Sequence, residues 1–264
     1  MKLGFIGTGN MASAIMGGII SQGVIKAEEI IGSDVSEVGR AKAKDMYGIH
    51  VTADNQEVVK VSDKVILSVK PQFYPSVIKE VKDCVKEGQI VITIAPGKTL
   101  EWLEEQFGKQ VKLVRTMPNT PAMVGEGMTA VCANSYVSEA ELDEVLQILG
   151  AFGKTEVVSE HLMDVVVSTS GSSPAYVFMM IEAMADAAVA DGMARQQAYK
   201  FAAQAVLGSA KMVLEIGKHP GELKDMVCSP GGTTIEAVRV LEAKGFRSAL
   251  IEAMKACAEM SKKM

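Results

Sequence analysis

The chain has 264 residues, with 27 basic against 32 acidic side chains and a formal net charge of −5 at pH 7. The charges form no long runs of one sign, so nothing predicts binding to nucleic acid or to an anionic membrane surface. No apolar run reaches membrane-spanning length. The four cysteines are far apart and form no CxxC pair, so neither a metal site nor a disulfide is expected and the reducing cytoplasm is the expected compartment.

The first part of the chain, to about residue 159, alternates short β-rich runs with amphipathic stretches, which is typical of βαβ units on a mostly parallel sheet. The runs are continuously apolar, as expected of strands that helices cover on both faces. They are KLGFIG, EIIGSD, KVILSV, QIVITIA, VKLVRTM, MTAVCA and TEVVS. Glycines at 23, 48, 88 and 108 mark expected helix ends. The pattern predicts an α/β domain of Rossmann type.

The segment GFIGTGNMA places Gly7, Gly9 and Ala12 in a G-x-G-x-x-A pattern between the first strand and a helix. This is the dinucleotide-binding fingerprint in its required context. Gly7 is expected to make the tight turn, Gly9 to let the pyrophosphate approach the backbone, and Ala12 to permit close packing of helix on strand. A glycine-rich turn without a ligand is the alternative, and it explains the flanking strand and helix less well.

Asp34 ends the second predicted strand, where an acidic side chain usually accepts hydrogen bonds from the adenosine ribose. This favours NADH over NADPH. Ser33, Ser36 and Arg40 are near enough in sequence to receive a 2′-phosphate if Asp34 turns aside, so both cofactors remain open. An aspartate at a strand end is also a common helix cap, which is the alternative to a cofactor role.

Other loops follow the predicted strands. SVKPQ comes after KVILSV and TIAPG after QIVITIA, so both lie at carboxyl ends of strands, the edge where open parallel sheets bind ligands. Lys70 in the first loop either faces a ligand or is an ordinary surface lysine. In the loop RTMPNTPAMVGEG, Asn119 and Thr120 either face the cofactor or close turns.

After about residue 161 the β-runs vanish and the chain is predicted to be all-helical. The segment from Pro174 to Ala190 is apolar around nearly its whole circumference and should be buried on all sides. About 100 residues can hardly enclose such a helix. The sequence therefore favours a partner subunit, and packing under the first domain is the alternative.

The segment CSPGGTTIEAV contains a small neutral turn before a predicted helix. Thr233 and Glu236 fit a Thr-x-x-Glu capping box, in which Thr233 caps the helix. A cap explains one threonine and leaves Thr234 without a purpose. It also does not explain why Gly231 and Gly232 leave the backbone bare at this point.

Five segments in order resemble the pyrroline-5-carboxylate reductase family over nearly the whole chain: GFIGTGNMA, SVKPQ, RTMPNTPA, SGSSPAY and SPGGTTIEAVRVLE. The last two are the more specific, because many dehydrogenases share the fingerprint. The resemblance implies a dinucleotide-binding Rossmann domain over residues 1–160 and an all-α dimerisation and substrate domain over residues 161–264. It also implies a homodimer assembled into a decamer, and reduction of 1-pyrroline-5-carboxylate to L-proline, the last step of proline biosynthesis, with NADPH or NADH.

Carried over by position, the resemblance gives one set of residues to each ligand. The expected cofactor set, completed by residues at the ends of predicted strands, is Ile6, Gly7, Thr8, Gly9, Asn10, Met11, Ser33, Asp34, Asn55, Ser68, Val69, Lys70, Pro71 and Ala95. The expected substrate set is Ser229, Gly232, Thr233 and Thr234. Within it, Thr234 and Ser229 are the expected catalytic residues. Many NADPH-preferring members have Asn-Arg where this chain has Ser33-Asp34, which leaves the cofactor preference open.

The reaction asks little of side chains, because an iminium already protonated on nitrogen needs only positioning and a hydrogen-bond partner. This agrees with the lack of a conspicuous His or Glu among the expected site residues. One rival is a hydroxyacid dehydrogenase of the 6-phosphogluconate type, but the base it needs is a lysine on the first long C-terminal helix, and residues 168–197 contain none. The other is a non-catalytic nucleotide-sensing protein, which has no need of the turn.

Overall fold

The computed structural model describes residues 2–263, and it divides into two compact units. The first unit contains the residues up to Ser172 together with those from Cys257 onward. The second unit is Ser173–Ala256. The division expected from the sequence, at residues 160 and 161, stays a prediction about which segments fold on their own. Within the described residues, none of the helices combines the length and apolar character that a membrane span needs.

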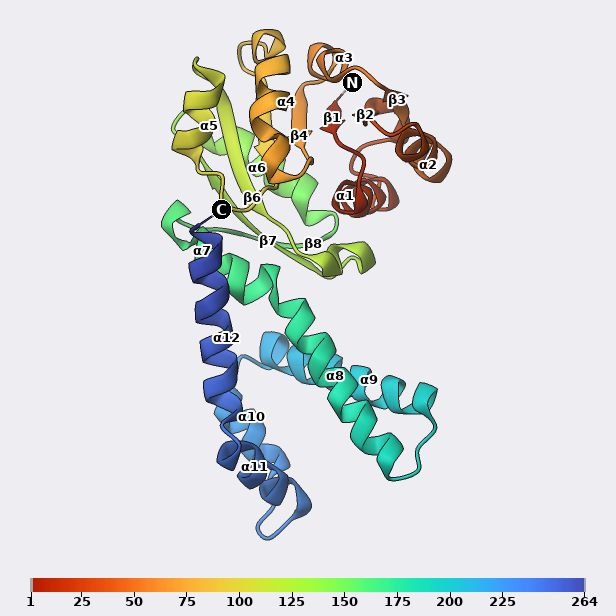
Figure 1. Ribbon diagram of the computed structural model, residues 1–264, viewed down its shortest axis with the longest axis vertical. Coiled ribbons are helices and arrows are strands. Elements are labelled where there is room, and N and C mark those ends of the chain that lie inside the picture. The colour runs from red at the N-terminus through yellow and green to blue at the C-terminus, as the bar shows by residue number, and fades with distance from the viewer. Residues whose placement is uncertain (1, 264) are drawn as a thin grey trace. The chain divides into compact units, whose positions relative to one another are not determined.

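The first unit is built on one eight-stranded sheet in the order β3-β2-β1-β4-β5-β6-β7-β8 (Figure 1). Neighbouring strands are parallel except β6 and β7, which are antiparallel. The strands are β1 (Leu3–Ile6), β2 (Ile30–Ser33), β3 (His50–Thr52), β4 (Lys64–Leu67), β5 (Ile90–Thr93), β6 (Lys112–Met117), β7 (Gly127–Ala133) and β8 (Gly153–Val157). The predicted α/β class with a mostly parallel sheet is confirmed.

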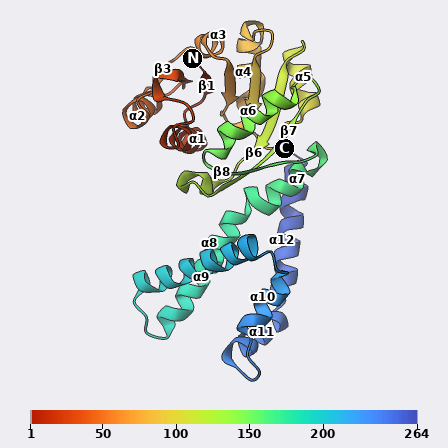
Figure 2. The same ribbon diagram turned by 180° about the vertical axis from the view of Figure 1, so that it is seen from behind.

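Helices cover both faces of this sheet, which is why its inner strands β1, β4 and β5 are almost continuously apolar. Leu3 and Phe5 of β1 pack with α1 (Asn10–Ser21), α2 (Glu37–Tyr47) and α6 (Glu139–Gly150). Ile6 of the same strand packs with α3 (Asn55–Val61), α4 (Tyr74–Val81) and α5 (Leu100–Phe107) on the other face. Figure 1 shows α4 and α5 in front of the sheet. Figure 2, the view from behind, shows α6 on the opposite face.

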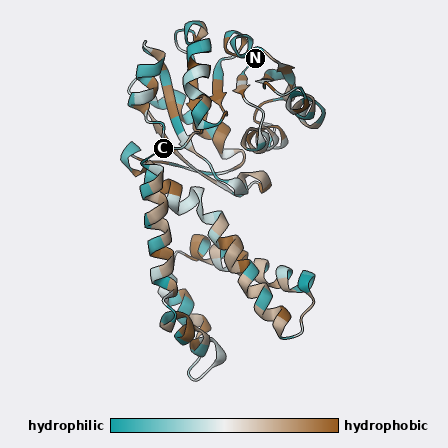
Figure 3. Ribbon diagram, viewed as in Figure 1, coloured by the Kyte–Doolittle hydropathy of each residue, from teal (hydrophilic) through white to brown (hydrophobic). Residues whose placement is uncertain are grey.

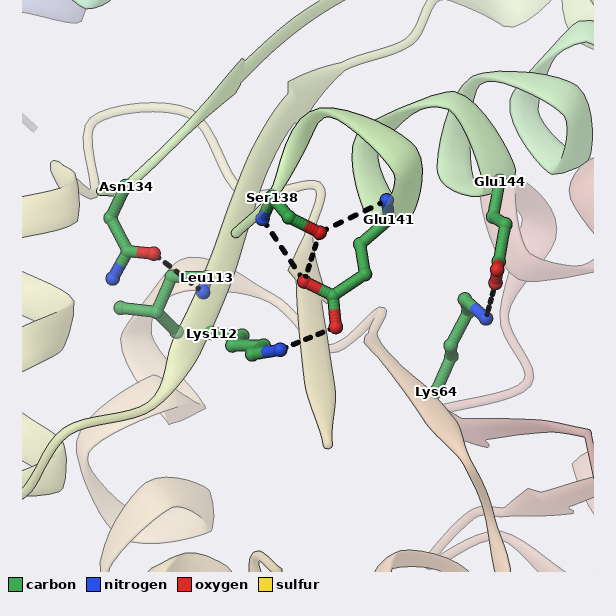
Figure 4. A network of polar contacts seen from close by, with 7 residues as sticks. All are labelled: Lys64, Lys112, Leu113, Asn134, Ser138, Glu141 and Glu144. Atoms are coloured by element: carbon green, nitrogen blue, oxygen red, sulfur yellow. Dashed lines mark hydrogen bonds and ion pairs between the residues drawn. The ribbon is translucent and has the colours of Figure 1, made fainter. Parts of the chain in front are cut away.

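Polar contacts fasten α6 to the strands of the sheet (Figure 4). Ser138 and Glu141 form a capping box at the start of the helix, and Lys112 at the start of β6 pairs with the Glu141 carboxylate. The Lys112 ammonium, followed by the Ser138 N–H and hydroxyl, lowers the pKa of Glu141 to about 2. Lys64 at the start of β4 pairs with Glu144, 2.7 Å away. Charged side chains thus hold a helix against two strands.

The first unit also contains the segment that leads toward the helical unit. After α7 (Met163–Val166), residues Val167–Gly171 form a single π-helical turn. Just before α5, Lys98 Nζ lies 4.8 Å from the ring centroid of Trp102, which is on that helix. At the end of the chain, Ser261 donates a hydrogen bond of 2.7 Å to Asp164. The last turn of α12 is therefore attached to α7.

The second unit consists of helices alone: α8 (Ser173–Ala190), α9 (Arg195–Ile216), α10 (Pro220–Val227), α11 (Thr233–Ala243) and most of α12 (Phe246–Ser261). Its buried apolar residues are only Ala185, Ala198, Ala202 and Leu223. Hydrophobic residues recur along its exposed helices (Figure 3). On α8, Phe178 is 60% exposed and Met179 69%. α9 covers only part of the surface of α8, so one helical unit alone does not bury α8 on all sides, and its burial against a partner subunit stays a prediction.

Candidate active site

The carboxyl ends of β1, β2, β4 and β5 meet at one edge of the sheet, as parallel strands require. The chain runs outward from β1 through β2 to β3 and then returns to β4 on the other side of β1. Open α/β sheets bind ligands at such a reversal of strand order. The structure brings the expected cofactor residues at the ends of β1, β2, β4 and β5 together along this edge: Ile6 to Met11, Ser33, Asp34, Ser68 to Pro71 and Ala95. Asn55 begins α3.

The glycine loop after β1 has the conformation that the fingerprint predicts. Gly7 has a φ of +97°, and a Cβ there would lie 2.8 Å from the Ser68 carbonyl oxygen. The Ser68 hydroxyl donates to the Gly7 carbonyl at 2.7 Å and to the Ile6 carbonyl at 3.1 Å. At Gly9 a Cβ would meet no atom within 4 Å. The backbone of the loop is therefore held in place at Gly7, whereas at Gly9 open space lies next to the backbone.

The start of α1 offers free N–H groups beside this bare backbone. Gly9 is the N-cap residue, no side chain caps the helix, and its first turn carries no acidic residue. The N–H groups at Asn10 and Met11 therefore keep the partial positive charge of a helix N-terminus. Such an end binds phosphates. These residues fit the pyrophosphate of a dinucleotide.

Asp34, directly after β2, is bound to the glycine loop. Its Oδ2 accepts from the Thr8 N–H at 2.9 Å and from the Thr8 hydroxyl at 3.1 Å, while Oδ1 accepts from the Ser36 N–H at 2.9 Å. The cap of α2 is Ser36, whose hydroxyl accepts from the Gly39 N–H at 3.1 Å. The alternative in which Asp34 caps a helix is therefore wrong.

Ser33 and Asn55 belong to a separate polar chain. The buried Ser33 hydroxyl donates to the Asn55 side-chain oxygen at 2.7 Å. Asn55 in turn donates to the Glu80 carboxylate at 2.9 Å. The structure thus couples Asn55 to Ser33 and leaves Asp34 to a different set of donors.

The remaining loop residues vary in exposure. Lys70 is exposed to solvent, whereas Ala95 is buried. The buried Tyr74 hydroxyl donates to the Leu67 carbonyl at 2.6 Å and supports the loop from Ser68 to Pro71, and its burial raises the pKa of this side chain. Asn119 ties its loop to two other elements, because its side chain donates to the Ser170 carbonyl at 3.0 Å and accepts from the Met128 N–H of β7 at 2.9 Å.

The turn before α11 lies in the second unit and is described within it. The Gly232 N–H donates to the Ser229 carbonyl at 3.0 Å, and Gly231 has a φ of +69°. A Cβ at Gly232 would lie 2.3 Å from the Ser229 hydroxyl oxygen. The absence of a side chain at Gly232 is what lets the Ser229 hydroxyl lie against the start of the helix.

The helix after this turn begins differently from the capping box that its sequence suggests. Its N-cap is Gly232, with no side-chain cap, and Thr233 is the first helical residue. Glu236 pairs with Arg239 through two hydrogen bonds of 2.9 and 2.6 Å. The expected cap by Thr233 is therefore wrong, since a residue already inside the helix cannot fold its side chain back over the N2 and N3 N–H groups.

Neither the N–H groups nor the hydroxyls of this helix start are used for capping. No side chain caps α11, and its first turn carries one acidic residue, Glu236, which is paired with Arg239. Thr233 and Ser229 are exposed, and Thr234 is partly buried. Among residues 2–263, no side-chain hydrogen bond occupies the hydroxyls of Ser229, Thr233 or Thr234. Hydroxyl donors and helix N–H groups are thus available together.

The comparisons with known proteins cover both units. Residues 160–264 match the family model described as pyrroline-5-carboxylate reductase dimerisation, and residues 2–97 match one described as NADP oxidoreductase coenzyme F420-dependent. Over 263 residues the chain is 53% identical to the pyrroline-5-carboxylate reductase of Escherichia coli, covering 100% of this chain and 98% of that protein. The chain belongs to the pyrroline-5-carboxylate reductase family. It is 44% identical to the family member of Methanosarcina acetivorans, covering 100% of this chain and 97% of that protein.

Solved structures of the family have the same fold over the whole chain. The enzyme of Coxiella burnetii matches with a TM-score of 0.92 at 36% identity, covering 99% of this chain and 97% of that one. The pyrroline carboxylate reductase of Plasmodium falciparum with NADP bound matches with a TM-score of 0.91 at 32% identity, covering 100% and 97%. The resemblance read from the five motifs is confirmed, and with it the oxidoreductase class and an oligomeric state.

Two features of this family member were not predicted from its sequence. The attachment of Asp34 to Thr8 joins residues 26 positions apart, and only the fold brings them together. The π-helical turn at Val167–Gly171 lies just before and within the SGSSPAY motif. Such turns are frequent at functional sites, but the sequence marks this one by nothing more than Gly171.

Proposed function

We propose that the chain reduces 1-pyrroline-5-carboxylate to L-proline with a nicotinamide dinucleotide as hydride donor, the last step of proline biosynthesis. The observation that carries the proposal is the full-length similarity to pyrroline-5-carboxylate reductases, at 53% identity in one relative. It spans the glycine loop and the Ser229–Thr234 turn alike. The dinucleotide is assigned to the first unit and the imine to the turn of the second.

The first unit would hold the cofactor through its backbone and Asp34. The N–H groups at the start of α1 would bind the pyrophosphate at the bare Gly9, and Asp34 would accept hydrogen bonds from the adenosine ribose. The loops from Ser68 to Pro71 and at Ala95 would line the nicotinamide half. When bound, the reduced nicotinamide supplies a hydride to the imine carbon.

The second unit would hold the substrate at the start of α11. The free N–H groups of Thr233 and Thr234 would bind the carboxylate, with the Ser229 hydroxyl assisting, and the Thr234 hydroxyl would meet the ring nitrogen. The protonated C=N bond gains the hydride at carbon while the nitrogen keeps its proton and becomes a secondary amine. The side chains therefore orient the ring and need not supply a strong acid.

A neutral turn suits this substrate. A fixed carboxylate beside the helix start would repel the substrate carboxylate, and a lysine would disfavour the cationic iminium. The charged residues nearest in sequence are paired with one another, Glu236 with Arg239 and Lys224 with Asp225. The hydroxyls of the turn thus act without a competing charge on the turn itself.

The assembly and location belong to the same proposal. The exposed apolar helices of Ser173–Ala256 would form a homodimer, and such dimers would assemble into a decamer. Residues 1–160 would act as the dinucleotide-binding domain and residues 161–264 as the dimerisation and substrate domain. The unpaired cysteines at 84, 132, 228 and 257 are compatible with the reducing cytoplasm.

The direct test supplies the imine with NADH and NADPH in separate assays and follows cofactor absorbance. Oxidation of either cofactor, with proline as product, is expected. Cofactor binding without turnover would instead favour the nucleotide-sensing alternative. Oxidation of a 3-hydroxy acid at neutral pH would favour the hydroxyacid dehydrogenase.

A further inference from the structure

The Asp34 carboxylate is fixed in place by three hydrogen bonds. Two come from Thr8 in the glycine loop, through the N–H at 2.9 Å and the hydroxyl at 3.1 Å, and one comes from the Ser36 N–H at 2.9 Å. Both carboxylate oxygens are engaged. Hydrogen bonds to a charged group are stronger than neutral ones, so Asp34 is held in a single orientation at the carboxyl end of β2.

Thr8 cannot easily release this carboxylate, because its own side chain is packed. Thr8 is 6% exposed, and a Cβ at Gly32 would lie 2.8 Å from its methyl carbon. The methyl group occupies the space that Gly32 leaves open, and the hydroxyl on the same Cβ points to Asp34. Rotation of Thr8 would break the contact and the hydrogen bond together.

The groups that could receive a 2′-phosphate each also hold part of the fold. Ser33 is fully buried and donates to Asn55 at 2.7 Å. The Ser36 hydroxyl caps α2. Arg40 directs one terminal nitrogen at the Asp34 carbonyl, 2.6 Å away, and at the Val35 carbonyl, 3.3 Å away. The nearby cation thus braces the backbone of the turn around the carboxylate.

From this arrangement we infer that the enzyme is selective for NADH, and that Thr8 is the positioning residue that makes Asp34 discriminate between the cofactors. The inference rests on the proposed function only for the identity of the cofactor class. A fixed carboxylate accepts the two ribose hydroxyls of NADH and repels the charged 2′-phosphate of NADPH. Charge repulsion at such short range corresponds to at least about tenfold in affinity.

Calorimetric titration of the purified oligomer with NADH and with NADPH tests the inference without turnover. The wild type is expected to bind NADH at least about tenfold more tightly. Asp34→Asn should reduce this ratio about tenfold or more, mainly through tighter NADPH binding. The matched control is Asp45→Asn, which removes the same charge from an exposed position of α2 and should leave the ratio unchanged.

A second pair of variants separates positioning from charge. Thr8→Val keeps the packed shape and removes the hydroxyl, so the NADH to NADPH affinity ratio should fall several-fold. Thr8→Ser keeps the hydroxyl and should retain most of the ratio. The adenosine fragment 2′,5′-ADP should bind the wild type more weakly than 5′-AMP, which lacks only the 2′-phosphate. The two fragments should bind Asp34→Asn equally.

Two outcomes would overturn the inference: equal or tighter binding of NADPH by the wild type, or an affinity ratio that Asp34→Asn leaves unchanged. If Thr8→Val left the NADH to NADPH affinity ratio unchanged, Thr8 would not be the residue that positions Asp34 for this selectivity. A failure of the proposed reaction has a different signature, because an enzyme that binds NADH selectively but leaves the imine unreduced would contradict the proposed function and leave the selectivity standing.

Discussion

Thr234 is the side chain on which the proposed reaction depends most directly. Replacing it by alanine should lower turnover of the imine by about ten- to thousand-fold, the range seen when one positioned hydrogen-bond donor is lost. Dinucleotide affinity and the melting temperature should stay nearly unchanged, because the hydroxyl has no internal partner to lose. Steady-state kinetics, cofactor titration and a thermal melt check these points.

Thr233→Ala is the matched control for this variant. The structure places Thr233 inside α11 with Gly232 as the N-cap, so its loss should change stability by less than about 0.5 kcal/mol. Replacing a threonine that did cap the helix, as the sequence suggested for Thr233, would instead cost about 1 kcal/mol. If Thr234→Ala alters only stability, the substrate does not bind at this turn.

The sequence predicted which residues belong to the candidate site, but it did not predict which of them contact one another. Gly7 and Gly9 could be assigned to the glycine loop because their spacing after an apolar run has one structural explanation. The partner of Asp34 could not, because Thr8 and Asp34 meet only through the parallel register of β1 with β2. Which residue caps α11 was equally hidden, since Gly232 and Thr233 are both acceptable caps and the turn geometry decides between them.

At the scale of elements, the turn before α11 depends on the missing side chain at Gly232. Gly232→Ala would place a Cβ 2.3 Å from the Ser229 hydroxyl oxygen and should displace that hydroxyl, raising KM for the imine. The double variant with Ser229→Ala removes the clashing atom. Thermal melting should show that the double variant regains the stability that the clash in Gly232→Ala costs. Its KM for the imine should stay raised, because the Ser229 hydroxyl is absent. Recovery of both would show that Ser229 has no role beyond occupying space.

The capping box of α6 predicts an acid-dependent loss of stability. Lys112 and Ser138 lower the pKa of Glu141 to about 2, so the folded state favours the ionised carboxylate. Its contribution is complete above the ordinary value of 4.5 and is lost as the pH falls through about 2. Glu141→Gln should therefore cost about 0.5–1 kcal/mol at neutral pH.

Urea unfolding at a series of pH values measures this difference. The gap between wild type and Glu141→Gln should begin to close near pH 4.5 and continue to narrow toward pH 2. A gap that does not change with pH would assign the effect to packing. Asp143→Asn, which removes an exposed carboxylate elsewhere on α6, controls for net charge.

The predictability of the elements depended on their burial. β1, β4 and β5 are covered on both faces, and their continuous apolar runs allowed them to be predicted as strands. β3 was not predicted, because its three residues, His50–Thr52, lie at the sheet edge and are only partly buried. The π-helical turn at Val167–Gly171 was also missed, since one extra residue in a helix leaves no periodicity to detect.

At the scale of the whole molecule, the apolar helices of the second unit require a partner chain. Met179→Glu on α8, at a side chain 69% exposed in the single chain, should dissociate the oligomer or lower its melting temperature at micromolar concentration. Met46→Glu on α2, at a side chain 58% exposed, should leave the mass unchanged. Light scattering on both variants decides the matter, and a wild-type mass equal to one chain would contradict the expectation.

Trp102 provides a fluorescence signal that reports on the first unit alone. It is the one tryptophan of the chain and lies on α5, in the first unit. Its fluorescence therefore follows the melting of the sheet unit, whereas far-UV circular dichroism also follows the helices of the second. Coincident curves would mean that both units unfold in one cooperative event. Separate curves would mean that the two units unfold independently. In that case a bound dinucleotide should raise the midpoint of the fluorescence curve and leave the part of the dichroism curve that follows the second unit unchanged.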